Sequence, residues 1–141
     1  MPADIFHFED TQRCEQGVTF DRVFPQYEGL TQAELYALAS GTMTAEQEAS
    51  VNSKRVDMTG YTARMQVRET IESASFAIEL TTENGRILID EALGEVNLLI
   101  SAADTSSLTA GSYVYDLELV SGSRVTRLIQ GRFVVDRGTT R

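Results

Sequence analysis

The sequence predicts an all-β fold, an antiparallel β-sandwich of seven or eight strands, and three observations support this prediction. Short segments in which apolar and polar residues alternate recur along most of the chain, as is typical of strands buried on one face. Turn-forming residues separate these segments at short intervals. The 141 residues suffice for one sizeable hydrophobic core. We therefore expect a single sandwich domain over residues 1–141.

The clearest strand pattern lies between residues 98 and 119. Leu98 and Ile100 share a face at the end of one run, and a second run is apolar at every other residue from Tyr113 to Leu119. A tyrosine just after the polar corner between two such runs is typical of immunoglobulin-like sandwiches. The sequence therefore predicts an immunoglobulin-like β-sandwich. We expect these residues to face its core: Tyr61, Met65, Phe76, Ile78, Leu98, Tyr113, Tyr115, Leu117 and Leu119.

The first strands are short. Segments 4–8 and 17–24 are predicted to be strands, and Pro25 either ends the second one or confines it to a sheet edge because proline lacks the N–H that a ladder needs. Strict alternation over residues 61–68 predicts a further strand.

Turns organise the second half of the chain. The turn signal at 83–85 predicts that 76–82 and 86–90 pair as a hairpin. A second turn at 93–95 leads into a predicted strand at 95–101.

The last two strands are predicted at 112–120 and 124–135, joined by the tight turn at 121–123. Gly131 lies inside the final strand, which indicates either a bulge or the close approach of another segment.

Residues 27–55 have a helical rhythm and are predicted to be a short helical insertion in the sandwich. Thr31 and Thr44 each precede a glutamate or glutamine by three residues, the spacing of a capping box, and Gly41 ends the first helix. The segment has more apolar side chains than two short helices can bury against each other. Packing on the chain's own sandwich and contact with a neighbouring chain both remain open. The candidate interface residues here are Leu30, Leu35, Tyr36, Leu38 and Met43.

The formal net charge of −9 disfavours nucleic acid and anionic membrane as partners. The charge is also uneven, because residues 1–50 carry nine acidic residues against two arginines, whereas residues 121–141 carry five arginines against one aspartate. Arg127 and Arg132 are therefore candidate residues for a contact between subunits. The alternative is that these arginines form an ordinary solvated strand face.

The sequence contains few of the residue combinations that form catalytic sites. We expect that the protein is not an enzyme and that it has no cofactor and no metal site. His7 is the only histidine, which excludes a multi-histidine metal site. The phosphate-binding glycine motifs and the GxSxG nucleophile motif are absent. Cys14 has no second cysteine to pair with, which fits folding in a reducing cytosol, and we expect a structural thiol. No apolar run spans a membrane, and no secretory signal is evident.

Several motifs together resemble a family of small structural proteins from the virions of tailed phages and prophages. They are the stretches 56–68 (VDMTGYTARMQVR), 80–86 (LTTENGR), 100–105 (ISAADT), 113–119 (YVYDLEL) and 131–133 (GRF). The resemblance covers roughly residues 15–24 and 56–136. Members of that family go from the early strand to a DLTGY-like motif through a short turn, whereas here residues 27–55 intervene.

The resemblance implies a non-enzymatic virion protein with an immunoglobulin-like sandwich, made in the cytoplasm of a host bacterium. It would be an adaptor in the head–tail connector, tail or baseplate, with other virion proteins as partners and multiple copies in a symmetric assembly. Two alternatives stay open, a host-surface carbohydrate-binding module of a tail fibre and a capsid decoration protein. The absence of tryptophan disfavours the carbohydrate alternative, since sugar sites usually need exposed aromatic rings.

Overall fold

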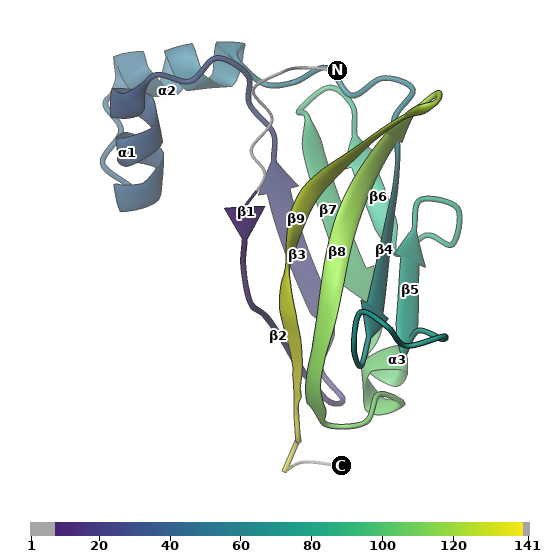
Figure 1. Ribbon diagram of the computed structural model, residues 1–141. Helices are drawn as coiled ribbons and strands as arrows, with labels where there is room; N and C mark the ends of the chain where they lie inside the picture. The colour runs from purple at the N-terminus through teal and green to yellow at the C-terminus, as the bar shows by residue number, and fades with distance from the viewer. Residues whose placement is uncertain (1–7, 140–141) are drawn as a thin grey trace.

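A computed structural model describes residues 8–139 and shows two β-sheets packed face to face, with a pair of helices projecting from one end (Figure 1). Side chains that point inward from both sheets form one hydrophobic cluster. The coarse prediction of a mostly β, sandwich-like fold is therefore confirmed over the described part of the chain.

The larger sheet has six strands in the order β1-β9-β8-β4-β5, and β2 continues the edge beside β9. Neighbouring strands are antiparallel, except that β1 and β2 run parallel to β9. The prediction of an antiparallel sandwich is therefore wrong at this one edge, where the start of the chain enters alongside the last strand. The strands are β1 (Phe8–Glu9), β2 (Gln12–Glu15), β4 (Thr62–Arg68), β5 (Ile78–Thr81), β8 (Gly111–Ser121) and β9 (Arg124–Asp136).

The smaller sheet has three antiparallel strands in the order β3-β7-β6. They are β3 (Phe20–Pro25), β6 (Ile87–Asp90) and β7 (Glu95–Ile100). Pro25 is the last residue of β3, which is an edge strand as the sequence indicated. The short helix α3 (Ala102–Ser106), capped by the hydroxyl of Ser101, carries the chain from β7 to β8 in the other sheet.

The described residues form nine strands, one more than the upper bound of the prediction. Strand β2 was missed because its inward residues are Gln12 and Cys14, which do not give the apolar alternation typical of a strand. Of the predicted strand at 4–8, residues 4–7 lie outside the described residues, and Phe8 begins β1.

The predicted hairpin between 76–82 and 86–90 is wrong. The turn itself is present, because the side-chain oxygen of Asn84 accepts hydrogen bonds from the N–H groups of Thr81 and Arg86, each at 3.0 Å. However, β5 pairs with β4 in the larger sheet, whereas β6 pairs with β7 in the smaller one. The turn therefore carries the chain between the two layers, and long-range packing rather than the turn decides the strand partners.

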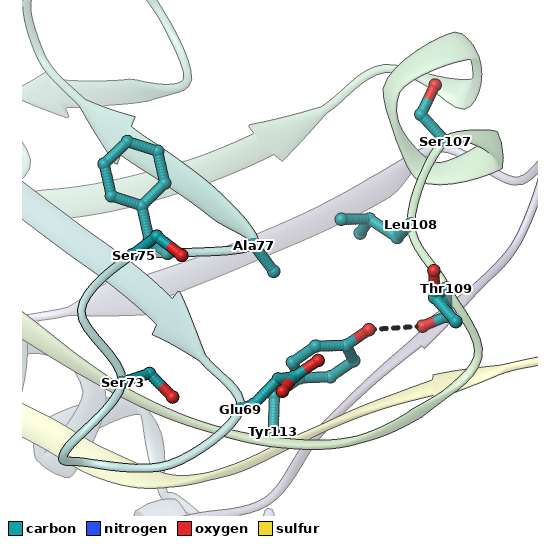
Figure 2. A pocket seen from close by; sticks show the side chains of 9 residues that line it. Glu69, Ser73, Ser75, Ala77, Ser107, Leu108, Thr109 and Tyr113 are labelled. Atoms are coloured by element: carbon teal, nitrogen blue, oxygen red, sulfur yellow. Dashed lines mark hydrogen bonds between the residues drawn. The ribbon is translucent and has the colours of Figure 1, made fainter.

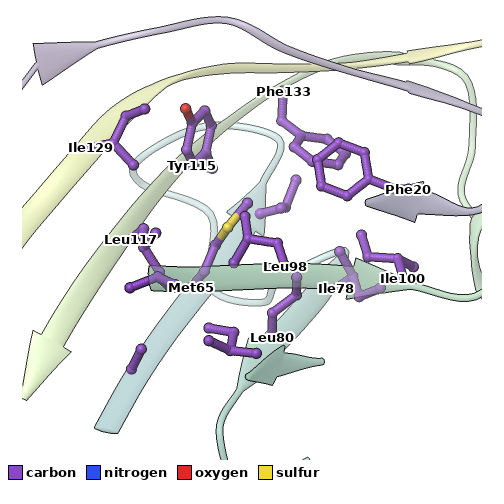
Figure 3. Packing of buried hydrophobic residues seen from close by; sticks show 14 of the residues in the cluster. Phe20, Met65, Ile78, Leu80, Leu98, Ile100, Tyr115, Leu117, Ile129 and Phe133 are labelled. Carbon is purple, nitrogen blue, oxygen red and sulfur yellow. The ribbon is translucent and has the colours of Figure 1, made fainter. Parts of the chain in front are cut away.

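The core lies between the sheets and is built from every second residue of the long strands (Figure 3). The ring of Phe20 lies 5.4 Å from that of Phe133, which in turn meets the ring of Tyr115 edge-on. Seven of the nine predicted core residues are buried, and Tyr61 is half-buried against the cluster. Phe76 is 45 % exposed, so its prediction is wrong, because β5 begins only at Ile78 and Phe76 lies in the preceding loop.

Two tyrosine hydroxyls on β8 connect the strand to irregular parts of the chain. The hydroxyl of Tyr113 donates to the carbonyl oxygen of Thr109 at 2.6 Å, across the corner after α3. The hydroxyl of Tyr115 donates to the carbonyl oxygen of Asp10 at 2.9 Å, between β1 and β2. Gly131, opposite Tyr115, lies so close to Asp10 that a Cβ atom would overlap the backbone there, which confirms the predicted close approach.

We expect Leu117→Ala to lower the free energy of unfolding by about 2–5 kcal/mol, because Leu117 is fully buried and its truncation leaves a cavity. Leu88→Ala is the matched control, since Leu88 is 55 % exposed and its change should stay within about 0.5 kcal/mol. Chemical denaturation of both variants checks this. Equal losses from the two substitutions would contradict the register of β8.

Candidate functional site

The described residues contain no group of three or more histidine, cysteine, aspartate or glutamate side chains placed to hold a metal ion. None of the described helices is long and apolar enough to cross a membrane. His7, the only histidine, lies outside the described residues. The surfaces that remain as candidates are the helical insertion, a groove on the larger sheet and a small polar pocket.

Cys14 points into the core from β2 and is 1 % exposed. Burial raises the pKa of the Cys14 thiol to about 11, although the nearby positive charge of Arg22 opposes the shift. The thiol is therefore protonated at neutral pH, and only the thiolate is a good nucleophile.

The helical arm, which we define as residues 27–55, consists of α1 (Gln32–Ser40) and α2 (Ala45–Ser53). Both predicted capping boxes are present. The hydroxyl of Thr31 accepts from the N–H of Glu34 at 3.2 Å, and the Glu34 carboxylate accepts in return from the Thr31 N–H at 2.9 Å. Thr44 makes the same reciprocal pair with Gln47 at the start of α2. Gly41 ends α1 in the left-handed conformation with φ 69°.

The base of the arm is held to the sandwich at a narrow neck. Tyr27 and Arg55 form an isolated antiparallel bridge, and the Arg55 guanidinium lies 5.3 Å from the centre of the Tyr27 ring. Arg55 also donates to the carbonyl oxygen of Leu93 at 2.9 Å and pairs with Glu95 at 3.4 Å. These contacts fasten the base of the arm, which lies between β3 and β4 in the chain, to the turn between β6 and β7.

An ion pair between a buried carboxylate and a half-buried lysine joins the first helix to the end of the second. Glu34 is 5 % exposed, and its carboxylate accepts a hydrogen bond from the Lys54 ammonium at 2.5 Å. This bond, together with the Thr31 cap, lowers the pKa of Glu34 from 4.5 to about 2. The carboxylate of Glu34 therefore stays charged over the whole physiological range.

The candidate interface side chains of the arm are only partly covered. Tyr36 is 73 % exposed. The other candidate interface residues in the arm are half-buried: Leu30, Leu35, Leu38 and Met43. None of the arm's residues belongs to the hydrophobic cluster of the sandwich, and the two helices project sideways from the sheets (Figure 1). The arm therefore presents an apolar surface that the described sandwich core does not use.

The outer-sheet groove is a depression of about 490 Å³ on the solvent face of β4, β8 and β9. Both predicted arginines line it. Arg127 pairs with Asp116 at 3.4 Å and lies 3.9 Å from Glu118, whereas Arg132 donates to the hydroxyl of Ser112 at 3.3 Å. Burial raises the pKa of Asp116, and the charge of Arg127 opposes this shift. The structure thus brings the two arginines together, but one of them is already paired within its own sheet.

A polar pocket of about 300 Å³ lies at the opposite end of the sandwich from the arm, between the loop after β4 and the corner after α3 (Figures 1 and 2). Glu69, three serines and Thr109 line it beside Phe76, and the hydroxyl of Tyr113 is bonded to the Thr109 carbonyl. The sequence did not predict this pocket, because its residues come from loops that carry no spacing signal.

No protein-family model matches the chain, and a search of curated proteins finds no match.

The pKa of Glu34 gives a pH dependence with a definite sign. A carboxyl whose pKa is lower in the folded state than in the unfolded state contributes stability that is present above pH 4.5 and lost as the pH falls toward 2. We expect the helix signals of α1 in NMR spectra to weaken over that range. Glu34→Gln should remove most of this dependence, and Glu48→Gln, at an exposed position, should retain it. Parallel behaviour of the two variants would contradict the role of the ion pair.

We expect the Cys14 thiol to react with a disulfide reagent such as DTNB only on unfolding, because it is both buried and protonated. The reaction followed at 412 nm in buffer and in denaturant measures this. Fast reaction of the folded protein would show that β2 opens readily.

Proposed function

We propose that the chain is a non-enzymatic structural protein of a tailed-bacteriophage virion. It acts as an adaptor in the head–tail connector, tail or baseplate, in several copies, after synthesis in the cytoplasm of the host bacterium. The motif resemblance supports the class of protein. The helical arm supports the adaptor role, since it leaves the sandwich at a fixed neck and exposes the aromatic ring of Tyr36.

We further propose that the sandwich is immunoglobulin-like. Three features support this: the first strands lie parallel to the last, the order β9-β8-β4 forms one layer opposite β3-β7-β6, and a tyrosine hydroxyl bonds back to the backbone at the corner before β8. Immunoglobulin-like sandwiches serve many unrelated functions, so the fold itself does not select one.

The observation that carries the proposal is the construction of the arm. A capping box fixes the start of each helix, and the Glu34–Lys54 ion pair joins α1 to the end of α2, while no arm residue belongs to the hydrophobic cluster of the sandwich. Tyr36 on α1 is 73 % exposed, and tyrosine is one of the residue types enriched at protein contacts. An adaptor needs such a preformed element that reaches beyond its own domain.

One observation favours a second candidate, the carbohydrate-binding module of a tail fibre. The polar pocket combines Phe76, an exposed aromatic ring, with Glu69 and several hydroxyls, a mixture that suits sugars. Tyr113 adds little, because its ring is buried and its hydroxyl is occupied. Binding to a glycan array that is abolished by Phe76→Ala would favour this candidate.

A capsid decoration protein would use the arm in the same way as an adaptor. Only the position of the protein in the particle, seen by cryo-electron microscopy, distinguishes these two roles.

Replacing residues 28–54 by Asn-Gly tests the proposal. The change keeps the bridging residues Tyr27 and Arg55 and joins them by a two-residue turn suited to an antiparallel pair. We expect the variant to fold, because the core cluster contains no arm residue, and to be missing from virions purified from the phage that encodes it. Thermal melting measures folding, and mass spectrometry of particles measures incorporation.

The matched control is Leu88→Ala, which leaves the arm intact and changes an exposed residue of the smaller sheet. It should be incorporated like the wild type. A folded arm-deletion variant that enters particles normally would remove the arm as the adaptor element. Wild-type protein absent from the particles would overturn the virion role.

A further inference from the structure

The outer-sheet groove carries an excess of positive charge, because Arg68, Arg127 and Arg132 line it together with a single carboxylate, that of Asp116. Arg127 pairs with Asp116 at 3.4 Å, and Arg68 acts on Asp116 only through the weaker electrostatic interaction at longer range. Arg68 donates to two neutral acceptors, the carbonyl oxygen of Ser73 at 2.7 Å and the side-chain oxygen of Gln66 at 2.6 Å. Arg132 donates to the Ser112 hydroxyl. Among the ion pairs of the described residues, neither arginine has a carboxylate partner. The groove is therefore prepared for an acidic ligand.

The helical arm carries the opposite charge. Its two basic residues are neutralised, Lys54 by Glu34 and Arg55 by Glu95. Glu46 and Glu48 lie exposed in the first turn of α2, where the helix dipole favours acidic side chains, and neither forms an ion pair within the described part of the chain. The charge that the arm presents to a partner is thus negative.

Both surfaces also present apolar groups without cover. Tyr36 on α1 is 73 % exposed. Ile71, which lines the groove together with Val114, is 82 % exposed. Aromatic residues that enter partly apolar pockets commonly supply much of the binding energy at protein interfaces. The arm and the groove therefore match in polarity as well as in charge.

We infer that the helical arm of one copy docks in the outer-sheet groove of a second copy of the same chain. This inference rests on the proposed function, because it names the partner of the arm. The arm projects sideways from its own sandwich rather than over the face of β4, β8 and β9 (Figure 1), so the contact joins neighbouring copies head to tail. Head-to-tail contacts generate closed rings or open filaments rather than two-fold dimers.

Charge reversal and charge exchange test the inference in the purified full-length protein. Sedimentation velocity over a range of concentrations should show self-association of the wild type. Arg68→Glu with Arg132→Glu should weaken association about 100-fold, because like charges then face each other. Glu46→Arg with Glu48→Arg should do the same. The variant with all four substitutions should regain most of the association. Near-UV circular dichroism checks that each variant is folded.

The matched control is Arg124→Glu with Arg137→Glu, which makes the same charge change at exposed arginines outside the groove. It should associate like the wild type. Association should also weaken between 0.1 M and 1 M salt, as the Debye length shrinks from about 10 Å to about 3 Å.

A cysteine pair gives an independent test of the contact. Tyr36→Cys and Ile71→Cys variants, mixed and oxidised, should form a disulfide-linked heterodimer, because the two positions meet only between copies.

Three results would each overturn the docking of the arm in the groove. They are a wild type that stays monomeric, a groove variant that associates normally, and a variant with all four substitutions that does not regain association. None of these results bears on whether the arm is needed for incorporation into particles. Loss of incorporation on arm deletion, combined with a monomeric wild type, would leave the proposed function standing with a different protein as the partner.

Discussion

The structure depends above all on the burial of the inward face of β8. This strand pairs with β4 on one side and β9 on the other, and its inward side chains, Tyr113 to Leu119, lie at the centre of the core. A one-residue slip would turn all of them toward solvent, so their burial fixes the register of both neighbours. The hydroxyl of Tyr115 also helps to position the edge strands of the larger sheet. It holds the backbone of Asp10, between β1 and β2, close to Gly131 of β9, so that β1 and β2 lie along β9.

Local signals in the sequence were sufficient wherever local chemistry decides the structure. The capping boxes at Thr31 and Thr44 predicted both helices, and the alternation in β4 and β8 predicted which residues are buried. Prediction failed where distant contacts decide. The turn at Asn84 forms as expected, yet β5 and β6 enter different sheets because their apolar faces find better partners in β4 and β7. Likewise, the groove and the polar pocket join residues from separate segments, and no spacing in the chain reveals them.

The arginine-rich last strand presents less positive charge to a partner than its number of arginines suggests. Arg127 shares its sheet face with Asp116 and Glu118, and Arg64 binds Glu118 as well, so part of the apparent basic face is internally neutral. Such exposed pairs contribute little to stability, and their main effect is to orient the side chains. The arginines without an ion pair on this face are not all in the last strand. Arg68, at the end of β4, donates only to neutral acceptors, and the net charge of residues 121–141 gave no indication of it.

The arm and the sandwich are stabilised by separate sets of interactions, and this separation has a dynamic consequence. The sandwich is held by one continuous apolar cluster, whereas the arm is held by helix caps, the Glu34–Lys54 pair and the neck at Tyr27 and Arg55. Short helices that bury few apolar groups open at a lower free energy than the core strands. The arm can therefore adjust to a partner while the sandwich keeps its shape. Contact with a partner would add the apolar burial that the arm lacks alone, so docking and ordering of the arm reinforce each other.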